Sequence, residues 1–413
     1  MEAKRATRLR ILFVCLAQSS HTHSWINLLK DQRLDVRVFG VGDTSAPRDF
    51  DFPVYSFSRG FPSLNPDTGM DTPSRIRPRI LRMVLRLLRK DKRIMEDEWL
   101  GKIIQRWQPT VVHTLGLDPS ALTYYDVFRK CNLKGRNLWI FTARGGPEFA
   151  LKRLLREEEA RIRSVLENCD RFIADNQQNY DYAVELGLGP EKIASIGVVP
   201  GTGGVEVDQL SDMGRVPPSA RKRMIVWPKA YECPASKALP VLEAIRLCWK
   251  AIRPCEIYMT AMIPETRMWL QTLPQDIRDS CHQRDRIPRE DLLKLMAQAR
   301  VMLSPSLSDG IPNTLYEAMA AGSFPILSPL ETIEAVVAKE TNVLFARNLY
   351  PQEIADALIR AMNDDQLVDR AYAENLKLVK RLADRKRIGE KVVNFYLEVA
   401  EFPESHRVPS SRK

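Results

Sequence analysis

The sequence predicts an α/β protein with two doubly wound parallel sheets, one in each half of the chain. Three observations lead to this prediction: the length of 413 residues, the alternation of apolar strand-like runs with amphipathic stretches, and the restart of that alternation after a polar segment that contains proline. A chain of this length exceeds a single ordinary core, so two domains of roughly 200 residues each are expected. Open parallel sheets bind ligands at the carboxyl ends of their strands, so we expect a deep cleft between the two domains.

The first domain is expected to span residues 1–205. Amphipathic stretches such as "SWINLLKDQ" and "SALTYYDVFRKC" separate its apolar runs. Strands that alternate with helices in this way are typical of parallel βαβ units with helices on both faces of the sheet. The predicted strands are residues 11–17, 35–41, 110–117, 137–143, 171–176 and 192–199.

The second domain is expected to span residues 223–388. It follows a predicted linker at residues 206–222, which includes the polar stretch "SDMGRVPPSARKR". Residues 389–413 are expected to form a helix and a tail that pack back on the first domain. The predicted strands of the second domain are residues 223–228, 255–261, 300–305, 323–329 and 342–346.

Composition narrows the class of protein. Hydrophobic residues make up 44% of the chain and charged residues 28%, which is typical of a soluble globular protein. The formal net charge of +10 indicates a nucleic acid, an anionic membrane surface or a phosphorylated substrate as partner. Seven cysteines without a CxxC pair favour reduced thiols and a cytoplasmic location. No run of 18 apolar residues predicts a membrane-spanning helix, and the apolar run at 11–17 is short for a signal peptide.

A motif at residues 304–322, "SPSLSDGIPNTLYEAMAAG", carries the strongest functional signal. It joins a buried strand to a helix, and seven residues separate its two acids, Asp309 and Glu317. A helix N-terminus favours phosphate groups, Gly310 lets a ligand approach the backbone, and Pro312 stiffens the loop. Either acid taken alone could instead cap a turn or favour the helix dipole.

This segment resembles the signature of family 4 of the retaining nucleotide-sugar glycosyltransferases, whose GT-B fold has two Rossmann-like domains. Asp309 stands where that family most often has glutamate. The resemblance implies that Glu317 binds the ribose hydroxyls of the nucleotide and that Asp309 contacts hydroxyls of the donor sugar. It also implies that backbone N–H groups face the diphosphate. The further candidates for nucleotide binding are Gly310, Ile311, Asn313, Thr314 and Arg286.

A second element opens the second domain. The segment "MIVWPKAYECPASKALPVLEAI" resembles the strand, basic residue and lysine before a helix of the same family. Lys229 occupies the position usually held by arginine, and Lys237 occupies the lysine position. Two cations over a diphosphate stabilise the charge that develops as the leaving group departs. For a single lysine, a solvated surface charge is the alternative.

The first domain supplies the predicted acceptor side. "LAQSSHTHSWINLL" places Ser20 and His21 after the first strand, and "TARGGPEF" places Arg144 and Gly145 after a later one. "VVHTLGL" places His113 at a strand end. All five are candidates for substrate binding through the family resemblance. A lone histidine such as His113 is more often a structural residue with satisfied hydrogen bonds.

The resemblance implies transfer of a sugar, with retention, from a nucleoside diphosphate donor to a hydroxyl acceptor. UDP-sugars are expected before GDP-sugars, and the product is expected to be a glycolipid, a polysaccharide or a cell-envelope glycan. The Asp-x-Asp segment at residues 49–51 lies in a turn-rich stretch, so we expect no metal and no other cofactor. The alternative is a catalytically silent protein of the same fold that binds a glycan or a nucleic acid.

The charge excess is concentrated at residues 75–93, where nine of nineteen residues are basic. A helix over this segment would have one cationic and one apolar face. That pattern fits an ordinary solvated helix or a helix on an anionic membrane surface. Nucleic acid is the third alternative, because no aromatic residues lie between the basic ones and no DNA- or RNA-binding motif is present. A lipid-linked or glycan acceptor, handled by a peripheral enzyme on the inner face of the cell membrane, is the resulting hypothesis.

Overall fold

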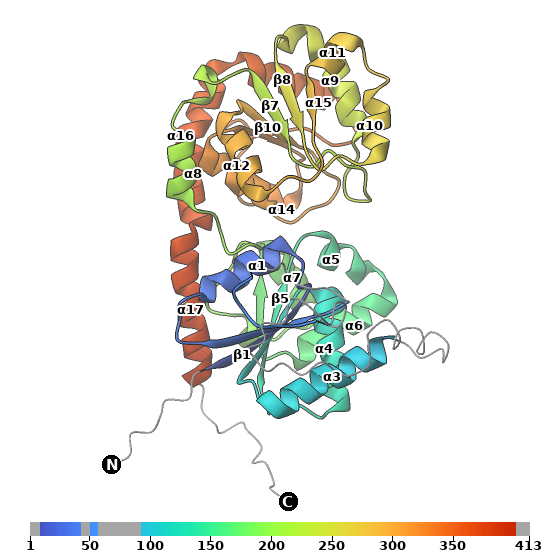
Figure 1. The fold of residues 1–413 in the computed structure, drawn as a ribbon, viewed down its shortest axis with the longest axis vertical. Helices are drawn as coiled ribbons and strands as arrows, with labels where there is room; N and C mark the ends of the chain where they lie inside the picture. The colour runs from blue at the N-terminus through green and yellow to red at the C-terminus, as the bar shows by residue number, and fades with distance from the viewer. Residues whose placement is uncertain (1–8, 43–49, 57–91, 402–413) are drawn as a thin grey trace, which may run out of the picture. The chain divides into compact units, whose positions relative to one another are not determined.

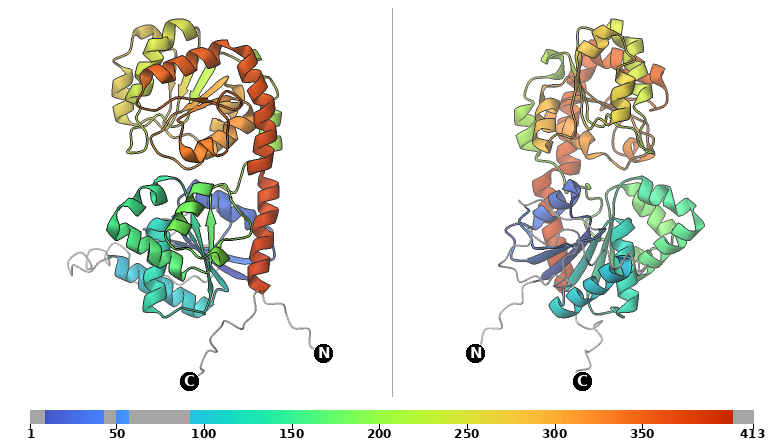
Figure 2. Two further views of the ribbon diagram at one scale, coloured as in Figure 1. Left: turned by 180° about the vertical axis from the view of Figure 1, so that it is seen from behind. Right: turned by 45° about the vertical axis from the view of Figure 1, so that its right-hand side comes forward.

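The computed structural model describes residues 9–42, 50–56 and 92–401, and it divides into two compact units. The first unit contains the described residues up to Arg144, those from Glu148 to Gly203 and those from Gly389 onward. The second contains residues 145–147 and 204–388. Figures 1 and 2 show helices on both sides of the sheet in each unit. Of the predicted basic helix at 75–93, all but the last two residues lie outside the described part of the chain.

The first unit is built on a six-stranded parallel sheet with the order β3-β2-β1-β4-β5-β6. The chain adds β2 and β3 on one side of β1 and then adds β4, β5 and β6 on the other side. This is the doubly wound order, and it places a topological switch point between β1 and β4. The strands are β1 (Arg10–Cys15), β2 (Asp35–Gly40), β3 (Val54–Ser56), β4 (Val111–Leu115), β5 (Leu138–Ala143) and β6 (Arg171–Ala174).

Alternate residues of these strands face two helical layers. Leu12, Val14 and Val112 pack in one apolar core with helices α3, α4 and α6, which lie side by side. Phe13 and His113 point to the opposite face, where Tyr396 of α17 packs against both rings. The helices of this unit are α1 (Ser20–Ile26), α3 (Lys92–Trp107), α4 (Leu122–Lys130), α5 (Pro147–Ala150), α6 (Arg156–Asn168) and α7 (Gln177–Glu185), and α17 (Arg385–Glu401) joins it from Gly389 onward.

The strand predicted at residues 192–199 is wrong. Only one isolated bridge forms there, between Ile193 and Phe172. Gly197 has φ of 69° and donates its backbone N–H to the carbonyl of Ala194, so a turn interrupts the apolar run before a ladder can extend.

The second unit has a six-stranded parallel sheet with the order β12-β11-β10-β7-β8-β9, again with connections in both directions from its first strand. One face is covered by α9, α10, α11 and α15, and the other by α8, α12 and α13, while α16 packs its first half in the former core and its second half in the latter. The strands are β7 (Met224–Trp227), β8 (Glu256–Met259), β9 (Cys281–Gln283), β10 (Val301–Ser304), β11 (Phe324–Leu327) and β12 (Leu344–Phe345). The helices are α8 (Val207–Met213), α9 (Leu239–Ile252), α10 (Pro264–Leu270), α11 (Gln275–Asp279), α12 (Arg289–Gln298), α13 (Asn313–Ala321), α14 (Glu331–Glu334), α15 (Pro351–Asn363) and α16 (Asp365–Ala383).

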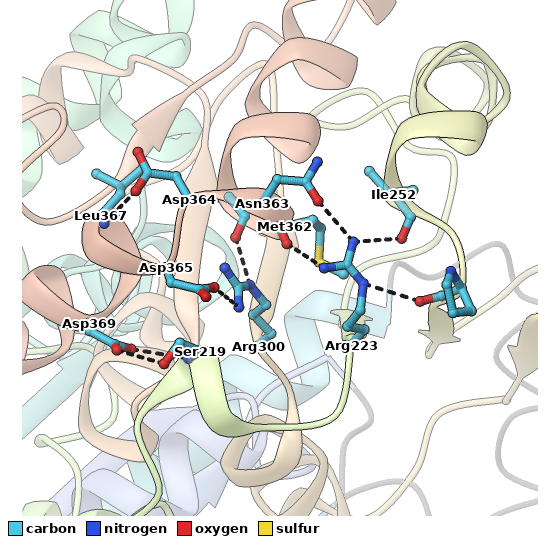
Figure 3. Close-up of polar contacts among 12 residues, drawn as sticks. Ser219, Arg223, Ile252, Arg300, Met362, Asn363, Asp364, Asp365, Leu367 and Asp369 are labelled. Carbon is cyan, nitrogen blue, oxygen red and sulfur yellow. Dashed lines mark hydrogen bonds and ion pairs between the residues drawn. The ribbon is translucent and has the colours of Figure 1, made fainter.

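Arginines at the amino ends of strands hold the helices of this unit to its sheet. Arg223 precedes β7 and donates to the carbonyls of Ile252 (2.9 Å) and Met362 (2.7 Å), which end α9 and α15 (Figure 3). Arg300 precedes β10; its Nε donates to the carbonyl of Ala361 at 2.9 Å, and its Nη1 pairs with Asp365 at 2.7 Å. Carbonyls in the last turn of a helix have no partner within the helix, so each guanidinium satisfies groups that burial would otherwise leave unpaired.

Arg221 does the same for the other face. It donates to five backbone carbonyls, and burial lowers its pKa to about 10. These carbonyls belong to the ends of α8, α12 and α13 and to the adjoining loops. Residues predicted as a linker are therefore part of this unit: α8 packs on α13, and Arg221 ties their ends together. Within the described residues, no helix combines the length and the apolar character that crossing a membrane requires.

Candidate functional site

The motif predicted to bind the donor lies at the carboxyl end of β10 and continues into α13. The loop between them is held by Thr332, whose hydroxyl donates to the carbonyls of Asp309 (3.1 Å) and Gly310 (3.2 Å). The helix is followed by Gly322, whose φ of 80° is a left-handed conformation that glycine adopts without strain. The two acids are thereby placed at the edge of the parallel sheet where ligands bind.

Asp309 is paired with Lys229. The Lys229 Nζ lies 2.5 Å from Asp309 Oδ2, and each side chain is 24% exposed. Lys229 follows β7, the strand next to β10, so the topology brings together two residues that are 80 positions apart in the sequence. Burial opposes the charge of Lys229, but the carboxylate of Asp309 more than compensates and raises the pKa of the ammonium group. Lys229 therefore stays charged at neutral pH.

Glu317 is paired with a residue that the sequence analysis did not name. Its side chain is 5% exposed, and its Oε1 accepts a hydrogen bond of 2.8 Å from Nε of Arg289, at the start of α12. Burial raises the pKa of Glu317, while the charges of Arg289 and Lys229 act in the opposite direction. The Oε2 atom has no partner among the described residues and is not sealed from solvent. One carboxylate oxygen is thus occupied by Arg289 and the other is available to a ligand.

Lys237 lies at the start of α9, beside another acid that the sequence analysis missed. Glu232 Oε1 accepts from the backbone N–H groups of Ala238 (2.8 Å) and Leu239 (3.1 Å), and its Oε2 lies 3.6 Å from Lys237 Nζ. A protein carboxylate therefore already occupies the N-terminus of α9, where a phosphate could otherwise bind. No sequence signal marks Glu232, because its role depends on the fold of the loop that carries it.

The N-terminus of α13 differs from that of α9. Pro312 occupies the capping position, and no side chain caps this helix. The hydroxyl of Thr314, in the first turn, is buried and has no hydrogen-bond partner within residues 9–42, 50–56 and 92–401. Ile311 is buried, Asn313 is partly exposed, and Arg286 is exposed on the connection between β9 and α12. An uncapped helix N-terminus with a buried, unpaired hydroxyl is suited to accept oxygen atoms of an anionic ligand.

In the first unit, His113 is fully buried, and both of its ring nitrogens are engaged. Its Nε2 lies 2.6 Å from the hydroxyl of Thr142, and its Nδ1 is hydrogen-bonded to the hydroxyl of Tyr396. Burial, with a contribution from Arg144, lowers the pKa of His113 well below its ordinary value, so the ring is neutral. These contacts favour the structural alternative, and contact of His113 with substrate stays a prediction.

The remaining acceptor-side candidates lie at the carboxyl ends of β1 and β5. Ser20 and His21 are exposed in the first turn of α1. Arg144 donates to the Thr22 hydroxyl at 3.4 Å, and Gly145 adopts φ of 72°. The cleft that would bring these residues to the donor-side acids stays a prediction.

No cluster of three or more potential metal ligands is present in the described parts of the chain. Asp51 of the Asp-x-Asp segment pairs with Lys30 at 2.8 Å, and Asp49 lies outside the described residues.

Comparison with known proteins agrees with this geometry. Residues 230–364 match the family model described as Glycosyl transferases group 1. The match includes both acids of the motif, Lys237 and Arg289, and begins one residue after Lys229. No curated protein matches the sequence.

Several solved structures share the architecture. A glycosyltransferase from Rickettsia africae ESF-5 has a TM-score of 0.66 at 14% identity, over 96% of this chain and 100% of its own. Anabaena HepE in complex with UDP-glucose has a TM-score of 0.65 at 12% identity, over 95% and 100%. Sucrose-phosphate synthase from Thermosynechococcus elongatus has a TM-score of 0.66 at 15% identity, over 95% and 99%. The fold is GT-B. The predicted fold class of two doubly wound GT-B sheets is therefore confirmed.

Proposed function

We propose that this GT-B protein is a retaining glycosyltransferase of family 4 that transfers a sugar from a nucleoside diphosphate, UDP before GDP, to a hydroxyl acceptor. The observation that carries the proposal is the arrangement of Asp309 and Glu317 around the uncapped N-terminus of α13, within the segment that matches the group 1 glycosyl transferases. The structural neighbour HepE was solved with UDP-glucose, which supports the choice of donor.

Each donor-site group has a chemical task in this proposal. The open Oε2 of Glu317 accepts hydrogen bonds from the ribose hydroxyls. The backbone and the unpaired hydroxyl of Thr314, at the start of α13, hold the diphosphate. Lys229 and Lys237 stabilise the charge that builds up on the departing phosphate, so no metal is required in the proposed mechanism.

The Lys229–Asp309 ion pair suggests how donor binding is linked to catalysis. Without a donor the two charges neutralise each other at 2.5 Å. A diphosphate competes for Lys229, and this frees Asp309 to accept hydrogen bonds from the sugar hydroxyls. In the front-side displacement that we propose, the bond from the anomeric carbon to the diphosphate breaks while the acceptor oxygen attacks from the same face. The departing phosphate oxygen takes the acceptor proton.

We further propose a lipid-linked or glycan acceptor and a peripheral enzyme on the inner face of the cell membrane. The positive net charge of +10 supports this part of the proposal. Flotation with liposomes of increasing anionic lipid content tests it, because an electrostatic association strengthens with lipid charge and weakens with salt.

Donor binding is the first test of the enzymatic proposal. Purified protein is mixed with UDP-glucose, UDP-N-acetylglucosamine or GDP-mannose, and both thermal protection and slow donor hydrolysis are measured. We expect protection by at least one donor and release of the nucleoside diphosphate. Failure of every nucleotide sugar to bind refutes the proposal. Binding of a glycan without any nucleotide release, even with an acceptor mixture present, would support the silent binding protein instead.

A further inference from the structure

Arg144 follows β5, and its guanidinium group forms no ion pair with any of the described residues. Its one hydrogen bond runs from Nη1 to the hydroxyl of Thr22 at 3.4 Å, and its Cζ lies 5.5 Å from the ring centroid of Trp25. The Nε and Nη2 atoms are buried and have no hydrogen-bond partner in the part of the chain that the structure describes. A guanidinium group has five N–H donors, so most of the donors of Arg144 are unused.

The two carboxylates that act on Arg144 electrostatically, Glu148 and Asp175, accept hydrogen bonds from other groups. Glu148 Oε1 accepts from the backbone N–H groups of Leu117 and Asp118, each at 2.9 Å. Asp175 Oδ1 accepts from the side-chain amides of Asn176 (2.8 Å) and Asn179 (3.2 Å). Both acids act on Arg144 through their electrostatic field, but neither forms an ion pair with it. Each acid therefore forms its hydrogen bonds with its own neighbours and not with Arg144.

The other groups around Arg144 carry no negative charge at neutral pH. Burial raises the pKa of the Cys15 thiol to about 12, although Arg144 itself acts in the opposite direction. Burial also raises the pKa of the Tyr396 hydroxyl and lowers that of His113, so both stay neutral. An unpaired buried cation is costly, and proteins rarely keep one unless a ligand completes the site.

We propose that Arg144 forms an oxyanion subsite on the acceptor side, and that the acceptor therefore carries a phosphate or carboxylate group near the hydroxyl that is glycosylated. The subsite lies at the carboxyl ends of β1, β4 and β5, the edge at which parallel sheets bind ligands. The planar guanidinium fork matches the two oxygens of a phosphate or a carboxylate. Arg144 as a residue is partly exposed, while its unpaired Nε and Nη2 atoms are buried. Identifying the ligand as an acceptor rests on the proposed transferase function.

Calorimetric titration of the full-length protein tests the subsite. The donor site is first saturated with UDP, so that an anionic probe cannot bind there. The probes are sn-glycerol 3-phosphate and glucuronate, with glycerol and glucose as neutral counterparts. We expect the anionic probes to bind and the neutral ones not to bind. Arg144→Gln should weaken anion binding by about ten- to a hundredfold, because charge-assisted hydrogen bonds are lost. Arg144→Lys should retain part of the affinity.

Arg161→Gln is the matched control. It removes the same charge from the first unit, but Arg161 is a surface residue paired with Glu158 at 3.0 Å. Its anion affinity should equal that of the wild type. The UDP affinity of all variants should also be unchanged, which shows that the second unit is intact.

A stability measurement separates this subsite from a structural role. Arg144→Met removes an uncompensated charge at similar volume, so its melting temperature should equal or exceed that of the wild type in the absence of ligand. A clear loss of stability, together with undiminished anion binding, would assign Arg144 to the structure and overturn the proposal. Absence of any Arg144-dependent anion binding would also overturn it. If UDP does not bind, the transferase proposal fails, yet the titrations without UDP still decide whether Arg144 binds an anion.

The probes also identify the source of the oxyanion. Sedimentation with vesicles of phosphatidylcholine and phosphatidylglycerol tests a lipid phosphate, and the comparison of interest is wild type against Arg144→Gln. A loss of vesicle binding in this variant alone indicates a lipid-borne phosphate. If glycerol phosphate or glucuronate binds but vesicle binding does not depend on Arg144, the acceptor is soluble and carries the same anionic group.

Discussion

The Arg289–Glu317 pair gives a quantitative test of the donor site. The change is Arg289→Gln, which removes the charge opposite a carboxylate that is 5% exposed. Removal of one partner from a fully buried ion pair costs about 3–5 kcal/mol. Because the Arg289 side chain is 44% exposed, solvent screens the pair and the smaller value of about 1–2 kcal/mol is appropriate. If Glu317 must be ionised to accept from the ribose, the loss of donor affinity reaches roughly 5- to 30-fold at pH values below the pKa of Glu317 and disappears well above it.

The pH dependence of binding gives the more specific signature. Burial raises the pKa of Glu317, and the groups that oppose this are Arg289 on α12 and Lys229 after β7. Loss of Arg289 should raise that pKa further. The protonated form then persists to higher pH, so donor binding should begin to fail at a higher pH in the variant than in the wild type as the pH is lowered. A folded-state pKa above the unfolded value also means that stability falls as pH rises between the two. The destabilisation caused by Arg289→Gln should accordingly be smaller at acidic pH than at neutral pH.

The assay is titration with UDP-glucose across the acidic to neutral range, since both phosphates of this donor are esterified and their charge stays constant. Lys294→Gln is the control, because it removes a charge from the same helix at an exposed site, where Lys294 pairs with Asp291. Equal pH profiles for wild type and Arg289→Gln would refute the reasoning. A uniform loss of affinity at every pH would show that Arg289 contacts the nucleotide directly and does not act through Glu317.

Three further predictions follow from the second unit. Asp309→Asn should lower turnover of the donor by far more than it lowers UDP affinity, because the expected partner of Asp309 is the sugar and the substitution leaves Lys229 free for phosphate. Steady-state rates and UDP titration check this, and equal losses of turnover and affinity would contradict it. Lys237→Gln should lower turnover with little change in melting temperature, because the ion pair of Lys237 with Glu232 is partly exposed. A large fall in melting temperature would contradict the catalytic role. Arg221→Met should lower the free energy of unfolding in urea by about 2–4 kcal/mol, since buried carbonyls lose their donor, whereas the exposed Arg215→Met should not.

The sequence predicts the fold because parallel strands buried on both faces appear as apolar runs. The elements that it missed are edge strands. β3 and β9 have three residues each, too few for any periodic signal, and their formation depends on a neighbouring strand already in place. Residues 192–199 show the opposite error, where an apolar run has the right composition but Gly197 turns the chain.

The acids of the candidate site can be predicted from the sequence, but the cations that pair with them cannot. Asp309 and Glu317 belong to one local motif, whereas Lys229 is 80 and Arg289 is 28 positions away from the acid that each contacts. His113 and Tyr396 are 283 positions apart, so the burial of this histidine could not be foreseen from its own segment. Such pairs are determined by which strands and helices become neighbours. A sequence read locally contains the chemistry of a site but not its tertiary contacts.

These partners explain how a site for a dianion can exist before the dianion arrives. Three acids surround the proposed donor position, and each has one cation: Asp309 with Lys229, Glu317 with Arg289, and Glu232 with Lys237. The free site is therefore close to neutral, and no buried charge is left without compensation. In the proposed mechanism, a diphosphate at the N-terminus of α13 also competes with these acids for their cations. We expect the two lysines to pair with the phosphates and Asp309 to turn to the sugar hydroxyls, while Glu317 keeps Arg289 and offers its second oxygen to the ribose. The exchange of partners confines a free carboxylate at Asp309 to the state in which a sugar is present to use it.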